Sequence, residues 1–304
     1  LRGYATPALT FLIEWTLKPF SSLKPLLSGK FDLVVVGCYN EMVQLLALQY
    51  MRLVRQPFII NLDGEAFIDS SLKGWLKRMA LHGATGYLTA GEASAKTLAQ
   101  AIGNKAPIVP YYFSSLSLSE ITSVPSSEPR LKTEILIPGQ YQDYKGLDVA
   151  MDVARSLPLL HFTFVGTNTD TDRFIAEMSP LPENVTVIPF LQTNDLYERY
   201  RRATVMLLPS RRECWGLVVN EAAGFGTPIV STYGSGAAVE FLEEEYPQYL
   251  AQPGSAESLT QALTCCLSDL EKSNAYASYL LEKSARYNIE RSVEQHIKLF
   301  NMLA

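Results

Sequence analysis

Histidine and cysteine are scarce in this sequence. Among its 304 residues there are three histidines, which lie far apart along the chain: His82, His161 and His296. There are four cysteines, and no pair of them has zinc-type spacing to a histidine: Cys38, Cys214, Cys265 and Cys266. We therefore expect no metal site, and reduced thiols in a cytoplasmic protein.

A surplus of positive charge is also absent. The formal net charge is −5 and the isoelectric point is about 5.4. Proteins that bind nucleic acid in general need an excess of lysine and arginine for the phosphates, so this class is excluded. Hydrophobic residues make up 47% of the chain and charged residues 19%, which is typical of a folded protein.

Long uninterrupted hydrophobic runs are missing as well. The apolar stretch at residues 5–20 is interrupted by Glu14 and Lys18 and is too short to cross a bilayer. We expect it to form a helix packed on a sheet, rather than a signal or membrane segment. The sequence begins with Leu1 and not with methionine, which fits a chain that lacks its natural start.

What the sequence does contain is a steady alternation of short apolar runs with segments of helical period. Residues 31–37 read FDLVVVG, as expected for a parallel strand buried on both faces. Residues 113–131 are rich in serine and proline, and we interpret them as a linker. The pattern predicts an α/β fold with two doubly wound, Rossmann-like domains, at residues 1–112 and 132–286, and a C-terminal helix at 287–304.

The sharpest local pattern is PSRRECWGLVVNEA at residues 209–222, a polar loop between a predicted strand and a predicted helix. Parallel sheets bind ligands at the carboxyl ends of their strands, where helix N-termini offer free N–H groups. We expect a diphosphate at this turn, with Glu213 and Glu221 gripping hydroxyl groups on either side. The turn residues expected at the ligand are Cys214, Trp215, Gly216, Leu217 and Val218. The alternative is that Glu221 caps a helix or forms a salt bridge and that Glu213 is solvated.

A second loop, at residues 139–146, follows the predicted strand at 133–138. Lys145 supplies a point charge suited to a phosphate, and Gly146 allows the backbone to approach closely. The alternative is an ordinary surface lysine at the start of a helix.

Both loops resemble known motifs of one enzyme family. Residues 208–228 closely resemble the E-x7-E signature of family 4 glycosyltransferases, which have the GT-B fold of two Rossmann-like domains facing a cleft. The second loop resembles the family's glycine-arginine…lysine-glycine pattern in Gly139, Lys145 and Gly146. It departs from that pattern at Gln140, where the family usually has an arginine for the diphosphate.

The missing arginine has two candidate replacements, Arg211 and Arg212. The alternative is that both are solvated side chains. The resemblance is close over residues 132–300 and loose over 30–112. Several elements of the family's first domain have no counterpart here, so we expect a shortened first domain, through either truncation or reduction.

The resemblance implies further site residues. Gly166 and Pro189 correspond to segments around the nucleotide base, while Gly234 and Gly236 correspond to a loop that closes on the diphosphate. Asp63 lies where many relatives have a histidine that contacts the donor sugar. For the glycine loop and for Asp63, a simple turn is the alternative interpretation.

The activity that the resemblance implies is transfer of a sugar, with retained anomeric configuration, from a UDP- or GDP-linked donor to a glycan or lipid-linked acceptor. Glu213, Lys145 and Asp63 would serve catalysis and Glu221 the ribose, with no cofactor or metal. The implied role is polysaccharide or glycolipid biosynthesis, in the cytoplasm or at the inner face of its membrane.

Three alternatives remain open. Asp170 and Asp172 form a D-x-D, the metal-binding motif of the other major glycosyltransferase fold, although helix capping explains them better. A shortened first domain is also compatible with a module that binds a nucleotide sugar without transferring it. A GT-B epimerase or phosphorylase would need its own acid–base group or cofactor lysine, and no such motif is recognisable.

Overall fold

The chain forms two compact units in a computed structural model. The first contains residues 1–111 and 293–304, and the second contains residues 112–292. The structure describes residues 11–13, 23–37, 42–63, 72–103, 106–122, 133–166, 171–270 and 274–304. Cys38 and Asp170, both considered above, lie outside these ranges.

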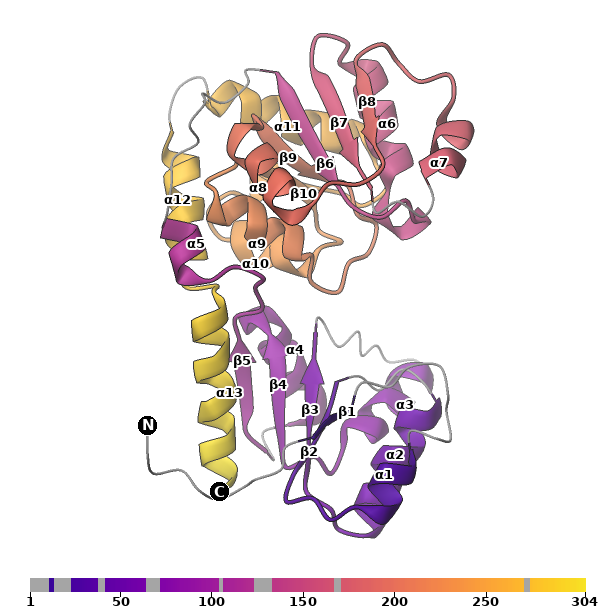
Figure 1. The fold of residues 1–304 in the computed structure, drawn as a ribbon, viewed down its shortest axis with the longest axis vertical. Coiled ribbons are helices and arrows are strands. Elements are labelled where there is room, and N and C mark those ends of the chain that lie inside the picture. Colours follow the sequence, from indigo (N-terminus) through magenta and orange to yellow (C-terminus); the bar gives the residue numbers. More distant parts are fainter. Residues whose placement is uncertain are drawn as a thin grey trace. The chain divides into compact units, whose positions relative to one another are not determined.

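The described part of the first unit contains a parallel five-stranded sheet in the order β1-β2-β3-β4-β5. The strands are β1 (Phe11–Ile13), β2 (Val34–Val36), β3 (Phe58–Leu62), β4 (Gly86–Ala90) and β5 (Ile108–Tyr111). The helices between them are α1 (Leu23–Ser28), α2 (Met42–Leu53), α3 (Leu72–Leu81) and α4 (Gly91–Ile102). The C-terminal helix α13 (Ile289–Leu303) lies alongside this sheet, with buried Leu299 against Gly86 (Figure 1).

The core of this unit consists of the apolar faces of α2, β2 and β3. Val34 and Val36 pack with Phe58 and Ile60 from the neighbouring strand, against Leu48 of α2. The strand residues are buried on both faces, as the continuous apolar runs predict for a parallel sheet.

One expectation for the N-terminal stretch is wrong. Within residues 5–20, where we expect a helix, Phe11–Ile13 forms strand β1 and pairs in register with Val34–Val36 of β2. Three successive apolar residues suit either element, and here the open edge of β2 supplies the hydrogen-bond partners that select a strand. The rest of that stretch lies outside the described residues.

The described part of the second unit contains a parallel six-stranded sheet in the order β11-β10-β9-β6-β7-β8. Its strands are β6 (Glu134–Pro138), β7 (His161–Val165), β8 (Val185–Ile188), β9 (Val205–Leu208), β10 (Ile229–Thr232) and β11 (Leu250–Ala251). Its α-helices are α5 (Leu118–Thr122), α6 (Leu147–Ser156), α7 (Thr171–Met178), α8 (Thr193–Arg202), α9 (Leu217–Gly224), α10 (Gly236–Leu242), α11 (Ala256–Leu270) and α12 (Ala275–Ser284). Two short 3₁₀ turns, η1 (Asp143–Lys145) and η2 (Pro247–Tyr249), complete it.

The strand order creates a reversal point between β6 and β9. The chain proceeds outward from β6 through β7 to β8, then returns to β9 beside β6 and proceeds the other way through β10 to β11. The loops that follow β6 and β9 therefore diverge from each other at the carboxyl ends of these two strands. In open α/β sheets this is where ligands bind.

The boundaries of the units differ from the expected ones at two places. The segment at 113–131, expected to be a linker, carries helix α5 as part of the second unit, and residues 123–131 lie outside the described ranges. The expected C-terminal helix is α13, whose residues from Val293 onward belong to the first unit. In the ranges given above, every helix is too short or too polar to cross a bilayer.

The turn into α6 gives a first testable prediction. Gly146 has a φ of +67°, and a Cβ atom there would lie 2.2 Å from the Pro209 carbonyl oxygen. Gly254 has a φ of +79°, but its Cβ would meet nothing nearer than 4.0 Å. Urea unfolding should show that Gly146→Ala lowers the unfolding free energy by about 1–3 kcal/mol more than Gly254→Ala, because only the first forces two loops apart. Equal losses would show that the loops separate easily.

Candidate ligand site at the reversal point of the second sheet

An ion pair joins the two diverging loops. The Lys145 ammonium, at the end of η1, lies 2.5 Å from the Glu213 carboxylate in the loop after β9. Both side chains are only 15% exposed, and Ser210 Oγ donates a second hydrogen bond of 3.2 Å to the same Glu213 oxygen. Two residues 68 positions apart in sequence, each predicted as a site residue, are thus brought together.

Arg211 ties the same loops together a second time. Its guanidinium donates two hydrogen bonds to the Asp148 carboxylate, of 2.7 and 2.5 Å, and one of 2.7 Å to the Asp143 carbonyl. Its own amide N–H donates to the Tyr144 carbonyl at 2.8 Å. These contacts lower the pKa of Asp148 and raise that of Arg211.

Those contacts bear on the missing diphosphate arginine. Arg211 is one of the two candidate replacements, but its guanidinium is used within the protein. The side chain of Arg212, the other candidate, is exposed, as is that of Gln140. Lys145 and Arg211 are thus both paired with carboxylates, and which cation meets a diphosphate stays a prediction.

The helix that follows Glu213 presents its N-terminus at this edge. Gly216 precedes α9 with a φ of +100°, and the Val219 N–H donates to the Gly216 carbonyl at 2.9 Å. The amides of Leu217 and Val218 lie in the first turn, where a helix has no carbonyl of its own to receive them. Helix α9 thus begins four residues after Glu213, as predicted, and binding of a ligand by its first amides stays a prediction.

The neighbouring Trp215 does not expose its ring to this edge. The indole is 3% exposed and donates from Nε1 to Asn220 Oδ1 at 2.8 Å, which anchors the loop to α9. Its carbonyl accepts hydrogen bonds from Ala237 N–H and Ser235 Oγ, so contact of Trp215 with a ligand stays a prediction. Cys214 is exposed, and within the described residues all three cysteines are free thiols: Cys214, Cys265 and Cys266.

The glycine loop after β10 packs against the Glu213 loop. Glu213 N–H donates to the Gly234 carbonyl at 2.7 Å, and Glu213 forms an isolated parallel bridge with Ser235. Added Cβ atoms at Gly234 and Gly236 would each come within 2.6 Å of backbone carbonyls in the Glu213 loop. Gly236 also begins helix α10, which sequence reasoning assigned to a loop. Close backbone packing by itself accounts for both glycines, and their contact with a ligand stays a prediction.

Glu221 lies at the fifth position of α9 and is held by two hydroxyl groups. Ser115 Oγ donates to Oε1 at 2.9 Å, and Tyr200 OH donates to Oε2 at 3.0 Å. Burial raises the pKa of Glu221, while the two hydrogen bonds oppose this shift. Ser115 belongs to the segment expected to be a linker, and its contact with a residue 106 positions away has no sequence signal.

The ends of β6, β7 and β8 carry the remaining predicted residues of this unit. Gly139 N–H donates to the Val165 carbonyl, and Gly166 N–H to the Ile188 carbonyl, both at 2.9 Å. A Cβ at Gly139 would meet nothing within 4 Å, so its surroundings are open to a ligand. At Gly166 it would collide with the Tyr141 ring, so protein packing explains that glycine. Pro189 follows β8 and is exposed.

Asp63 belongs to the first unit, at the end of β3. Its Oδ1 accepts a hydrogen bond of 2.6 Å from Tyr111 OH, and Tyr111 packs edge-on against His296. Partial desolvation raises the pKa of Asp63, while Tyr111 and the charge of His296 lower it. Its proposed contact with a sugar stays a prediction.

Asp172 lies in the first turn of α7. Over the residues that the structure describes, no three or more His, Cys, Asp or Glu side chains are grouped to hold a metal ion. Because Asp170 is not described, the D-x-D alternative is left to experiment.

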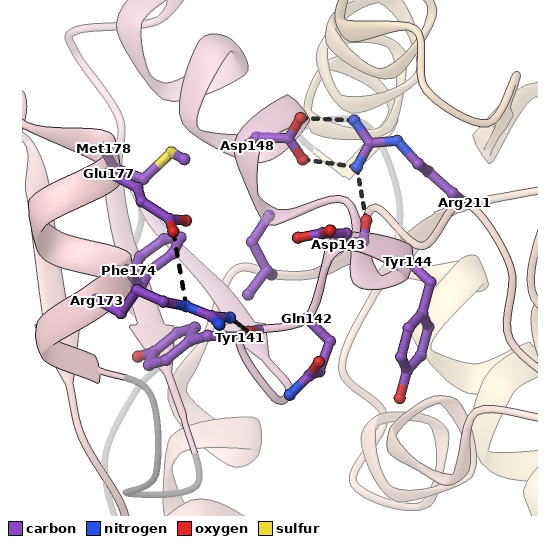
Figure 2. Close-up of a pocket in the computed structure, with 11 residues that line it drawn as sticks. Tyr141, Gln142, Asp143, Tyr144, Asp148, Arg173, Phe174, Glu177, Met178 and Arg211 are labelled. Carbon is purple, nitrogen blue, oxygen red and sulfur yellow. Dashed lines mark hydrogen bonds and ion pairs between the residues drawn. The ribbon is translucent and has the colours of Figure 1, made fainter.

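A pocket of about 470 Å³ lies between the η1 loop and helix α7 (Figure 2). It includes Arg173 and Phe174 of α7, and Phe174 stacks on Tyr141 with ring centroids 4.4 Å apart. The Asp148–Arg211 pair closes the opposite wall. Neither Lys145 nor Glu213 lines it, so it is distinct from the site predicted from the sequence.

Glu221 yields a prediction about stability. Because burial raises its pKa above the ordinary value, the folded protein holds this proton more tightly than the unfolded chain. At neutral pH the ionised carboxylate therefore lowers the free energy of unfolding. This loss of stability disappears as the pH falls below the ordinary glutamate pKa. Urea unfolding should therefore show that Glu221→Gln raises the unfolding free energy at pH 7 and changes it less near pH 4. The exposed Glu282 is the control, since Glu282→Gln should have little effect at either pH.

Comparisons with known proteins agree with this arrangement. A family model described as glycosyl transferases group 1 matches residues 121–282. A glycosyltransferase of Haemophilus influenzae with no assigned substrate is 27% identical over 167 residues, which are 53% of this chain and 47% of that protein. A D-inositol 3-phosphate glycosyltransferase of Corynebacterium urealyticum is 32% identical over 109 residues, or 36% and 26% of the two chains. The matched segments thus span about half or less of these relatives' lengths.

Solved structures share the fold over most of this chain. The sucrose-phosphate synthase of Thermosynechococcus elongatus superposes with a TM-score of 0.71 at 18% identity, covering 93% of this chain and 76% of that one. Anabaena Alr3699/HepE, solved with UDP and glucose, gives 0.68 at 18% identity, with 90% and 78% covered. A trehalose-6-phosphate synthase studied for glycosyltransfer with retention gives 0.69 at 13% identity, with 92% and 76% covered. The fold is GT-B, and since the family model matches more than half of the sequence, this chain belongs to the group 1 glycosyl transferases.

Proposed function

We propose that this protein binds a nucleotide diphosphate sugar at the reversal point of the second sheet and transfers the sugar, with retained configuration, to an acceptor hydroxyl. The observation that carries the proposal is the convergence of Lys145, Glu213 and the N-terminus of α9 at the edge where β6 and β9 diverge. Glu221 lies about one turn further along the same helix, at its fifth position.

The diphosphate matches the positive elements of this site. The Lys145 ammonium and the first amides of α9 offer a point charge and hydrogen-bond donors to phosphate oxygens. As the glycosidic bond breaks, negative charge grows on the leaving diphosphate, and these fixed groups stabilise it without a metal ion. Lys145 can retain its contact with Glu213, because an ammonium has three donors.

The carboxylates match the hydroxyl groups. Glu213 lies beside the proposed phosphate position, where Lys145 offsets the repulsion between carboxylate and phosphate. Its oxygens suit hydroxyls of the donor sugar. Each oxygen of Glu221 already accepts one hydrogen bond and keeps a lone pair for the vicinal hydroxyls of a ribose.

The class of donor and acceptor follows from the relatives. We infer a UDP- or GDP-linked sugar, because Alr3699/HepE was solved with UDP and glucose. Retention is inferred from the family 4 resemblance and from the trehalose-6-phosphate synthase. A glycan or a lipid-linked saccharide is the proposed acceptor, in polysaccharide or glycolipid biosynthesis in the cytoplasm. The assigned positions are Glu213, Lys145 and Asp63 for catalysis and Glu221 for the ribose.

Donor binding is testable by titration calorimetry with UDP-, GDP- and ADP-glucose. One nucleotide should bind, and Glu221→Ala should weaken it by about 1–3 kcal/mol through loss of the ribose contacts. The free nucleoside diphosphate should lose as much, because its ribose is the same. Glu177→Ala, on the far side of the η1 loop, is the control. Unchanged affinity in Glu221→Ala would disprove the ribose assignment.

Metal dependence separates the proposal from the D-x-D alternative. Transfer, followed as nucleoside diphosphate release in the presence of candidate acceptors, should persist in EDTA and in the Asp170→Asn/Asp172→Asn variant. Lys145→Ala should reduce kcat by about 10²–10³-fold, the usual effect of losing one charge-stabilising group. A strict requirement for Mg²⁺ or Mn²⁺ would favour the alternative. Binding without turnover for every acceptor would favour the non-catalytic module.

A further inference from the structure

Three neighbouring helices of the first unit contain no acidic residue. The sequences of α1, α2 and α3 are LKPLLS, MVQLLALQYMRL and LKGWLKRMAL, with five Lys or Arg residues and no Asp or Glu. The chain as a whole has a net charge of −5. Positive charge is thus concentrated in one part of an acidic protein, which is a mark of attraction to an anionic partner.

The same helices expose large apolar side chains. On α3, Trp75 is 50% exposed and Met79 is 46% exposed, and their spacing of four residues places them on one face. On α2, Leu46 and Leu53 are 46% and 84% exposed and are seven residues apart, again on one face. We call these four residues the α2–α3 face. The core of the unit is formed by other residues of α2, among them Leu48 and Met51.

The two helices are held together as one surface. They contact one another, α1 contacts α2, and the Arg52 guanidinium of α2 donates to the Ala80 carbonyl near the end of α3. In Figure 1 all three lie on the same side of the first unit. The exposed apolar groups and the basic residues are thus carried by helices that contact one another.

Helix α13 provides the contrast within the same chain. It also exposes apolar residues, Val293, Ile297 and Met302, but it carries Glu290 and Glu294 along its length. Apolar exposure alone is thus not special to α2 and α3. What distinguishes α2 and α3 is that exposed apolar residues occur together with basic residues and without any acidic residue.

We propose that the α2–α3 face docks on an anionic lipid bilayer. Trp75 and Met79 enter the boundary between head groups and acyl chains, as indole and thioether side chains do, while the exposed Lys24 of α1 attracts anionic head groups. The binding is peripheral, because the apolar face covers only one side of each helix. The inference rests on the proposed function in one respect, since it supplies the reason for lipid contact, namely a lipid-linked acceptor.

The test is flotation of the protein with vesicles, in the absence of donor and acceptor. Vesicles of phosphatidylcholine with phosphatidylglycerol should bind the protein, and vesicles of pure phosphatidylcholine should bind it much less. Raising the salt from 0.05 to 0.5 M should weaken binding, because it screens the charges. Trp75→Ser/Met79→Ser should reduce the partition coefficient about tenfold or more. Lys24→Glu, at an exposed position of α1, should reduce it at least fivefold, the effect of about one charge near such a surface.

Matched controls make the result decisive. Ile297→Ser removes an equally exposed apolar side chain from α13 and should leave vesicle binding unchanged. Brominated lipids should quench the fluorescence of the wild type, and Trp75→Ser should abolish most of that quenching. Thermal unfolding should confirm that each variant folds, and Leu53→Ser serves as a second probe of the face.

The proposal is overturned if the protein ignores anionic vesicles, or if the α2–α3 variants bind them as well as the wild type does. It is also overturned if sedimentation shows a dimer that Trp75→Ser dissociates, because the face would then join two copies of the chain. Donor affinity is measured independently with Glu221→Ala. Failure of vesicle binding therefore contradicts only the docking surface, and failure of donor binding contradicts only the proposed donor site.

Discussion

The ion pair between Lys145 and Glu213 depends on two loops leaving adjacent strands in opposite directions, and most of the second unit serves to hold those loops together. The Pro209 carbonyl packs closely against Gly146, and Arg211 pairs with Asp148 on the other loop. The Gly234 carbonyl accepts a hydrogen bond from the Glu213 N–H. These are short backbone approaches and charge-assisted hydrogen bonds, which tolerate little displacement. A rigid frame of this kind suits a site whose chemistry requires fixed charges rather than a mobile cation.

At Glu221, the residue proposed to bind the ligand lowers the stability of the fold at neutral pH. Its carboxylate is buried in part among Ser115 and Tyr200, and burial raises its pKa. A residue selected for packing alone would be apolar or an amide here. Under the proposed function, the carboxylate is kept because it accepts hydrogen bonds from the hydroxyl groups of a ligand.

The first unit adds a different kind of constraint. Strands β2 and β3 of its sheet are almost completely buried, but helices α1 to α3 combine a basic sequence with exposed Trp75 and Met79. If the protein uses a soluble nucleotide sugar and an acceptor held in a membrane, the second unit would bind the donor and the first unit would bind the membrane. This division accounts for a positive region in an otherwise acidic chain.

The sequence by itself determined the alternation of strands and helices, the two-sheet architecture and the identity of the two loops, because burial on both faces and glycine turns leave a local signature. It failed at Phe11–Ile13, where a neighbouring strand selected the conformation, and at Gly236, where a helix begins inside a run of small residues. Only the tertiary structure decided that Lys145 meets Glu213, that Arg211 is occupied by Asp148, and that Ser115 supports Glu221. These contacts join residues 63 to 106 positions apart, so they arise from strand order and not from any local pattern.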